Sequence, residues 1–275
     1  MYNDSPIKDP EKDCLNRMDF VYQLYQMITN YNYSDSLTIG LESKWGDGKT
    51  SIINLLLNLL NENIIVIKFN PWNLSDDLDL YDKFFNELLF ALESNNHENK
   101  LNQLKISLKK YQHQVSPVMT IGGLLVQILT RIPVNFGEKI NDWTYGKKSI
   151  EELKEDINSE IFRQKVKILI IIDDIDRLSD KNIRLIFNLA ASVANFNNII
   201  YLLAYDREVV IKSLNQSQCF SGEKYLEKII QVPISLPKNT KTQLKDYFKK
   251  GIDDVFNNLI YPLMRNIIYI LFLMI

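Results

Sequence analysis

The chain of 275 residues has few of the side chains that build metal centres and disulfide frameworks, with only two cysteines and two histidines. Cys14 and Cys219 lie far apart in the sequence, which excludes a closely spaced metal-binding pair. So low a cysteine content is typical of a reducing compartment, and we expect a cytoplasmic protein. The net charge of −2 shows no overall excess of basic residues, so the composition gives no direct indication of nucleic-acid binding.

The chain also lacks an apolar run of the ~20 residues that a membrane-spanning helix needs. Residues 118–132 (VMTIGGLLVQILTRI) contain two glycines, Gln127 and Arg131, and we expect a buried or interfacial hairpin there. Peripheral membrane contact is the alternative for this segment. Residues 267–275 (IIYILFLMI) indicate a truncated chain, or a segment completed by a partner or the membrane surface. The polar, acidic N-terminus resembles neither a signal peptide nor a transit peptide.

Glycine is scarce as well, yet two of the nine glycines lie in one short loop. Residues 37–60 read LTIGLESKWGDGKTSIINLLLNLL, which predicts an apolar strand at 37–41, a turn, and a leucine-rich helix at 50–61. The run from Gly46 to Ser51 is the second half of the Walker A pattern, G-x-x-x-x-G-K-[ST], in its strand–loop–helix context. Ser43 stands where the pattern has its first glycine. This substitution raises the question of how closely that part of the loop wraps a phosphate.

The Walker A pattern assigns a role to each part of the loop. Glycines let backbone N–H groups wrap phosphate oxygens, and the N-terminus of the following helix adds its positive end. Lys49 is expected to reach the β- and γ-phosphates and to contribute to catalysis, while the Thr50 hydroxyl is expected to bind Mg²⁺. The predicted ATP-binding residues of the loop are Trp45, Gly46, Asp47, Gly48, Lys49, Thr50 and Ser51.

A second motif follows the clearest strand, residues 166–172 (VKILIII). Its apolar run ends in Asp173-Asp174-Ile175-Asp176-Arg177, a Walker B signature that brings carboxylates to the edge of the sheet beside the phosphate loop. Asp173 is predicted to hold Mg²⁺ through water, and Asp174 to act as the general base that orients the attacking water. In the alternative, Asp174 only pairs with Arg177 and shapes the turn. Asp176, or a residue from another subunit, then becomes the better candidate for the base.

Further apolar runs at 63–69 (NIIVIKF) and 198–204 (NIIYLLA) are typical of buried strands in a parallel sheet. The second run ends in Tyr205-Asp206-Arg207, which predicts that Asp206 or Arg207 senses the γ-phosphate, or that Arg207 simply pairs with Asp206. A short edge strand is expected at 232–236. Helices are expected at 17–29, 79–93, 150–162, 182–195 and 240–260, with an insertion at about 101–160.

Several blocks in this order resemble the KAP family of P-loop NTPases: WGDGKTS at 45–51, FNPW at 69–72, IIDDIDRLS at 171–179, AYDREVV at 204–210 and YLEKIIQVPISLP at 225–237. The lead-in DPEKDCLNR at 9–17 is similar to the N-terminal block of that family. The resemblance implies a three-layer α/β ATP-binding core of the AAA+/STAND type. It further implies a mainly parallel five-stranded sheet in the order 5-1-4-3-2. In many members the insertion between the Walker motifs carries transmembrane helices, but here it is too short and polar to span a membrane.

These inferences together predict a KAP-type domain at residues 1–237 and the start of an incomplete helical segment at 238–275. The expected function is Mg²⁺-dependent ATP binding and hydrolysis that switches a protein partner or effector, with bacterial defence suggested by phage-excluding relatives. Homo-oligomerisation is a further expectation. The alternatives are a switch that holds ATP without hydrolysing it, a membrane-associated scaffold, and an inactive truncated relic.

Overall fold

The computed structural model describes residues 5–32, 35–61, 63–73, 80–94, 101–119, 148–216 and 221–264. Two compact units make up the chain: one comprises residues 27–49 and 59–236, and the other residues 1–26, 50–58 and 237–275. Cys219, most of segment 118–132 and all of segment 267–275 lie outside the described residues. Among the helices that are described, none combines the length and the hydropathy needed to cross a membrane.

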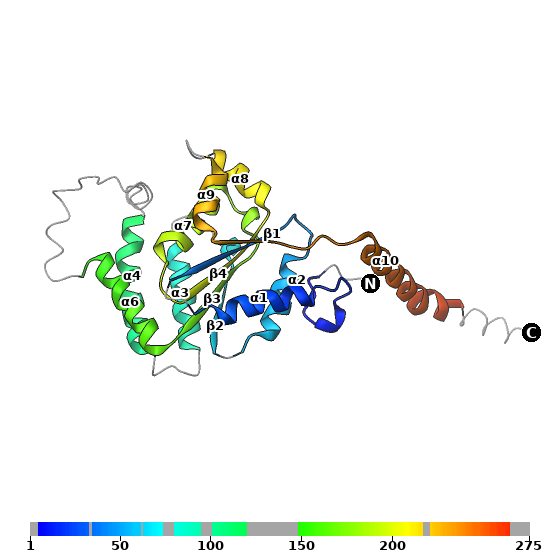
Figure 1. The fold of residues 1–275 in the computed structure, drawn as a ribbon, viewed down its shortest axis with the longest axis horizontal. Coiled ribbons are helices and arrows are strands. Elements are labelled where there is room, and N and C mark those ends of the chain that lie inside the picture. Colours follow the sequence, from blue (N-terminus) through cyan, green and yellow to red (C-terminus); the bar gives the residue numbers. More distant parts are fainter. Residues whose placement is uncertain are drawn as a thin grey trace, which may run out of the picture. The chain divides into compact units, whose positions relative to one another are not determined.

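The larger unit contains a sheet of five strands: β1 (Leu37–Glu42), β2 (Ile64–Phe69), β3 (Lys167–Ile172), β4 (Ile199–Tyr205) and β5 (Val232–Ser235). Their order is β2-β3-β4-β1-β5, which is the expected 5-1-4-3-2 arrangement. Figure 1 labels strands β1 to β4. All neighbouring strands run parallel. The carboxyl ends of β1 and β4 are in register at Glu42 and Tyr205, and those of β2 and β3 at Phe69 and Ile172. The residues that follow these strands therefore meet at one edge of the sheet.

The apolar runs of β3 and β4 form strands whose two faces are both buried, whereas on β2 Lys68 is exposed and Val66 is only partly buried. In β3, Ile168 and Ile170 belong to the large hydrophobic core of this unit, while Leu169 and Ile171 point to the opposite face and are equally buried. A strand of a parallel sheet has such a continuous apolar sequence because the connections between the strands cover both faces of the sheet. The expected three-layer α/β class is confirmed.

Helical segments between the strands contribute to that core. They are α3 (Leu80–Glu93), α4 (Asn102–Met119), α6 (Ile150–Gln164), α7 (Asp180–Asn188), a π-helical turn (Leu189–Val193), α8 (Arg207–Gln216) and α9 (Gly222–Ile229). Helices α4 and α6 pack against each other and belong to the expected insertion between the Walker motifs (Figure 1). The sequence Ser-Ile-Glu-Glu starts α6 with a capping box, in which Ser149 and Glu152 satisfy each other's backbone N–H groups.

The π-helical turn ties this insertion to the core. The helix ends at this turn, so its last carbonyl groups have no partner within the helix, and buried carbonyls need a donor. Side chains of the insertion and of the sheet supply it: Lys154 donates to the oxygen of Ser192, Tyr111 to that of Val193 at 2.6 Å, and Tyr201 to that of Ala194 at 2.8 Å. Burial lowers the pKa of Lys154, because the ammonium group is partly desolvated there.

The smaller unit combines the N-terminal lead-in with most of α2 (Lys49–Leu59) and with α10 (Lys241–Val255), and α1 (Met18–Asn30) begins in it. The lead-in lies alongside α2 and is hydrogen-bonded to it. The Ile7 N–H donates to Ser51 Oγ at 3.2 Å, and Asn54 Nδ2 donates to the Ile7 oxygen at 3.2 Å. Helix α10 lies within the range 240–260 for which the sequence predicts a helix. It begins with a capping box formed by Thr240 and Gln243.

Candidate nucleotide-binding site

The loop between β1 and α2 has the backbone conformation that its glycines allow. Gly46 and Gly48 have φ values of 87° and 95°, which lie in the left-handed region that side-chain-bearing residues rarely adopt. Asp47 closes the loop, because its N–H donates to the Lys44 oxygen at 3.3 Å and its Oδ2 accepts from the Lys44 N–H at 2.9 Å. The sequence thus builds a tight turn directly before the first turn of α2.

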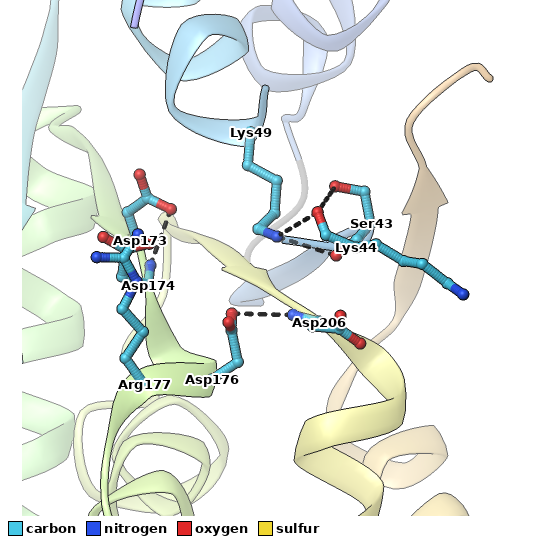
Figure 2. A network of polar contacts seen from close by, with 8 residues as sticks. All are labelled: Ser43, Lys44, Lys49, Asp173, Asp174, Asp176, Arg177 and Asp206. Carbon is cyan, nitrogen blue, oxygen red and sulfur yellow. Dashed lines mark hydrogen bonds and ion pairs between the residues drawn. The ribbon is translucent and has the colours of Figure 1, made fainter. Parts of the chain in front are cut away.

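Lys49 is the first residue of α2, and its side chain is buried. Its Nζ donates to the backbone oxygens of Ser43 at 2.9 Å and Lys44 at 3.2 Å, as Figure 2 shows. A buried ammonium needs such acceptors, because desolvation without a partner is costly. The charge of Lys49 is therefore held inside the loop by two neutral carbonyl acceptors.

The other predicted loop residues have diverse environments. Trp45 is 75% exposed, and Thr50 is partly buried as the second residue of α2. The Ser51 hydroxyl accepts the hydrogen bond from Ile7 described above. The Ser43 hydroxyl donates to the Lys44 oxygen at 3.3 Å, so the serine that replaces the first glycine keeps its side chain within the loop.

The paired carboxylates after β3 are separated by an immediate turn of the chain. Asp174 has φ 57° and ψ 33°, in the left-handed region, and its N–H donates to Asp173 Oδ1 at 2.8 Å. A 3₁₀ turn, η4 (Ile175–Arg177), follows. Arg177 Nη2 lies 3.1 Å from Asp174 Oδ1, so the ion pair considered from the sequence is present (Figure 2).

Opposing influences act on the pKa of the Asp174 carboxyl. Partial burial raises the pKa of its carboxyl above the ordinary value, and the charges of Asp173 and Asp176 raise it further. Arg177 and Lys49 lower this pKa, because positive charge favours the carboxylate. The two Walker motifs are thus electrostatically coupled in this structure.

The end of β4 is joined to the same turn through Asp176. Its Oδ1 accepts a hydrogen bond from the Asp206 N–H at 3.0 Å (Figure 2). The carboxylate of Asp206 accepts from the N–H groups of Glu208 and Val209 at 3.0 and 3.5 Å, and so caps the start of α8. Asp206 therefore lies beside the predicted site, with its side chain engaged by the helix that follows.

Arg207 has different partners from the one considered from the sequence. Its Nε lies 3.7 Å from Glu42 Oε2, and its Nη2 lies 2.8 Å from Glu223 Oε1. Glu42 Oε1 also accepts a hydrogen bond from the Tyr205 hydroxyl at 2.8 Å. The alternative in which Arg207 pairs with Asp206 is therefore wrong: Arg207 pairs with Glu42 and Glu223, and the Asp206 carboxylate caps α8. Sequence reasoning missed Glu42, although a carboxylate at the end of the Walker A strand was a visible signal.

The residues predicted to hold Mg²⁺ carry oxygen donors of the kind that this ion prefers. Mg²⁺ binds proteins through one or two carboxylates, with phosphate oxygens and water completing its octahedral shell. Asp173 as a carboxylate and Thr50 as a hydroxyl therefore stay the predicted ligands. Within the described ranges, no group of three or more His, Cys, Asp or Glu residues is placed to hold a metal on its own.

Comparisons with known proteins point to one family. The sequence profile of the KAP family P-loop domain matches residues 17–259. The phage T7 exclusion protein of Escherichia coli K12 is 21% identical over 288 residues, which cover 93% of this chain and 37% of that protein. The chain thus spans little more than a third of the length of that relative.

Solved structures of low sequence identity were also found. Cdc6p from Pyrobaculum aerophilum (14% identity, TM-score 0.45) matches 89% of this chain and 51% of its own. The ORC2 protein of Aeropyrum pernix (12% identity, TM-score 0.41) matches 85% of this chain and 51% of its own. The profile match covers most of the sequence, including both Walker motifs, and on that evidence the chain belongs to the KAP family of P-loop nucleotide-binding domains.

Proposed function

We propose that this domain binds ATP with Mg²⁺ and hydrolyses it, and that the nucleotide state switches a protein partner or effector. The single observation that carries the proposal is the position of Lys49. Its buried ammonium group is held by the Ser43 and Lys44 carbonyls, inside a loop whose glycines leave room for phosphate. Exchanging these neutral acceptors for anionic phosphate oxygens adds a direct attraction between opposite charges to the hydrogen bonds that the ammonium group donates.

In this proposal the residues divide the work. The backbone from Trp45 to Ser51 and the N-terminus of α2 receive the phosphates. Thr50 and Asp173 are the residues that would hold Mg²⁺, and the ion would neutralise phosphate charge there. Asp174 accepts the proton of the attacking water and orients it. Asp206 acts through its bond to Asp176, which joins β4 to the catalytic turn.

The test is to measure ATP affinity by calorimetry and turnover by phosphate release for the parent, Lys49→Ala and Asp174→Asn proteins. Binding that depends on Lys49, with turnover that depends on Asp174, supports the proposal. Binding without turnover in the parent supports the second candidate, a nucleotide-gated switch that does not hydrolyse ATP. Unchanged affinity in Lys49→Ala overturns the site assignment.

A role in bacterial defence is a proposal for the effector, supported by similarity to the phage T7 exclusion protein over most of this chain. Plaque counts on cells that express the parent or Lys49→Ala protein test it, since a nucleotide-dependent defence fails in the variant. We also propose that the protein contacts membranes peripherally and forms homo-oligomers. These two properties are tested by vesicle co-sedimentation and by analytical ultracentrifugation with and without ATP.

A further inference from the structure

The turn that follows Asp174 is held from both neighbouring strands. Strand β3 lies between β2 and β4 in the sheet. On the β4 side, Asp176 Oδ1 accepts from the Asp206 N–H at 3.0 Å. On the β2 side, the guanidinium carbon of Arg177 lies 5.9 Å from the centre of the Trp72 ring, within the range of a cation–π contact.

The sequence after β2 presents the Trp72 ring to this contact. Pro71 begins a short 3₁₀ turn (Pro71–Asn73), and Asn70 Oδ1 accepts from the Trp72 N–H at 3.0 Å. Phe69 and Ile172 are in register, so the residues after β2 and β3 emerge side by side. Trp72 is half exposed, and the structure thus keeps a large apolar ring near solvent with a guanidinium group over it.

Arg177 connects that ring to the proposed base. Its Nη2 lies 3.1 Å from Asp174 Oδ1, and its backbone N–H donates to the Asp174 oxygen at 3.1 Å. Asp174 itself has a left-handed backbone conformation, so its carboxylate direction depends on the turn that Arg177 closes. Trp72, Arg177 and Asp174 therefore form a series of contacts from β2 to the catalytic edge.

We propose that Trp72 and Arg177 are positioning residues for ATP hydrolysis: the ring orients the guanidinium group, and the guanidinium group orients the Asp174 carboxylate toward the attacking water. This inference rests on the proposed hydrolytic function of the site. Neither residue needs to touch the nucleotide, so their removal lowers turnover and leaves ATP affinity nearly intact. A misplacement of about 1 Å in a catalytic group can cost roughly 100-fold in rate.

The chain offers matched controls for both residues. Arg163 and Glu160 on α6 form an Arg–carboxylate ion pair with the same i, i+3 spacing, at 2.7 Å. Phe162 on α6 is an aromatic residue that is 77% exposed. Replacing Arg163 by Gln or Phe162 by Leu repeats the chemical change at a helix of the insertion.

The experiment measures kcat and ATP affinity for Arg177→Gln, Trp72→Leu, their double variant and the two controls. We expect kcat to fall about 10- to 100-fold in Arg177→Gln and by a smaller factor in Trp72→Leu, with ATP Kd within about threefold of the parent. The controls should match the parent. Trp72→Phe should recover most of the lost rate, since it keeps an aromatic face, and it also guards against a folding defect.

Double-mutant cycles decide whether the residues act in series. In an Asp174→Asn background, Arg177→Gln and Trp72→Leu should cause no further loss of kcat, because the group that they position is gone. Additive losses in that background, or equal losses in the α6 controls, overturn the inference and leave the proposed function standing. A parent whose turnover does not exceed that of Lys49→Ala overturns the proposed function, and the inference falls with it.

Discussion

The Lys49 Nζ atom lies 2.9 Å from the backbone oxygen of Ser43, the residue that replaces the first glycine of the Walker A pattern. The contact uses the main chain, so it is available to any residue at this position. The Ser43 hydroxyl turns instead to the Lys44 oxygen. The φ angle of Ser43 is not positive, so its backbone conformation does not require glycine.

The first prediction concerns this replacement. Ser43→Gly should leave the fold intact and leave ATP affinity unchanged or tighter, because glycine lets the backbone approach phosphate closely. Isothermal titration calorimetry with ATP and Mg²⁺ measures the effect. A clear loss of affinity would show that the serine side chain itself is needed.

Lys49→Ala should weaken ATP binding at least tenfold, or about 1.4 kcal/mol. The variant removes the point charge that reaches the terminal phosphates and leaves the backbone N–H groups of the loop in place. Calorimetry on parent and variant provides the measurement, and Lys148→Ala is a suitable control, since Lys148 forms an exposed ion pair with Asp156 near the start of α6. Equal losses in both variants would contradict the role of Lys49.

Two glycines of the β1 region should respond to alanine for different reasons. At Gly46 an added Cβ meets no atom within 4 Å, so the cost of Gly46→Ala comes from its φ of 87° and amounts to about 1–2 kcal/mol. At Gly40 an added Cβ would lie 2.7 Å from the Tyr205 hydroxyl, so Gly40→Ala displaces the hydrogen bond to Glu42. Urea unfolding and ATP titration separate the two effects: Gly46→Ala should impair ATP binding more than its loss of stability explains.

The paired carboxylates should differ in their effects. Asp173→Asn should lower Mg²⁺-dependent ATP affinity and turnover together. Asp174→Asn should preserve ATP binding and lower turnover about 10²- to 10⁴-fold. Single-turnover hydrolysis and ATP binding on both variants make the comparison. If Asp174→Asn hydrolyses ATP at the parent rate, Asp174 only pairs with Arg177, and Asp176 becomes the next candidate.

Glu42→Ala should destabilise the larger unit. Its carboxylate accepts from the Tyr205 hydroxyl, and burial together with that carboxylate raises the pKa of Tyr205. Removing the acceptor leaves a buried hydroxyl unsatisfied, which costs about 1–3 kcal/mol. The free energy of unfolding in urea measures it, and Glu42→Gln, which retains an acceptor oxygen, should lose less.

The sequence by itself determined those features that depend on neighbours in the chain. Gly46 and Gly48 predicted a compact loop between a strand and a helix, and the apolar runs at β2 and β4 predicted buried strands of a parallel sheet, because these properties follow from local conformation and side-chain polarity. The resemblance to KAP domains supplied the strand order. Asp174 was correctly paired with Arg177 as an alternative, since only three residues separate them.

The tertiary structure alone decided which polar groups of different strands meet. Arg207 lies next to Asp206 in sequence and yet pairs with Glu42 and Glu223, while Asp176 meets the backbone of Asp206 and Trp72 meets Arg177. These contacts depend on the register at the carboxyl edge of the sheet and on the turn that ends each strand. A shift of one residue in register reverses which face a side chain occupies, so no local pattern specifies such partners.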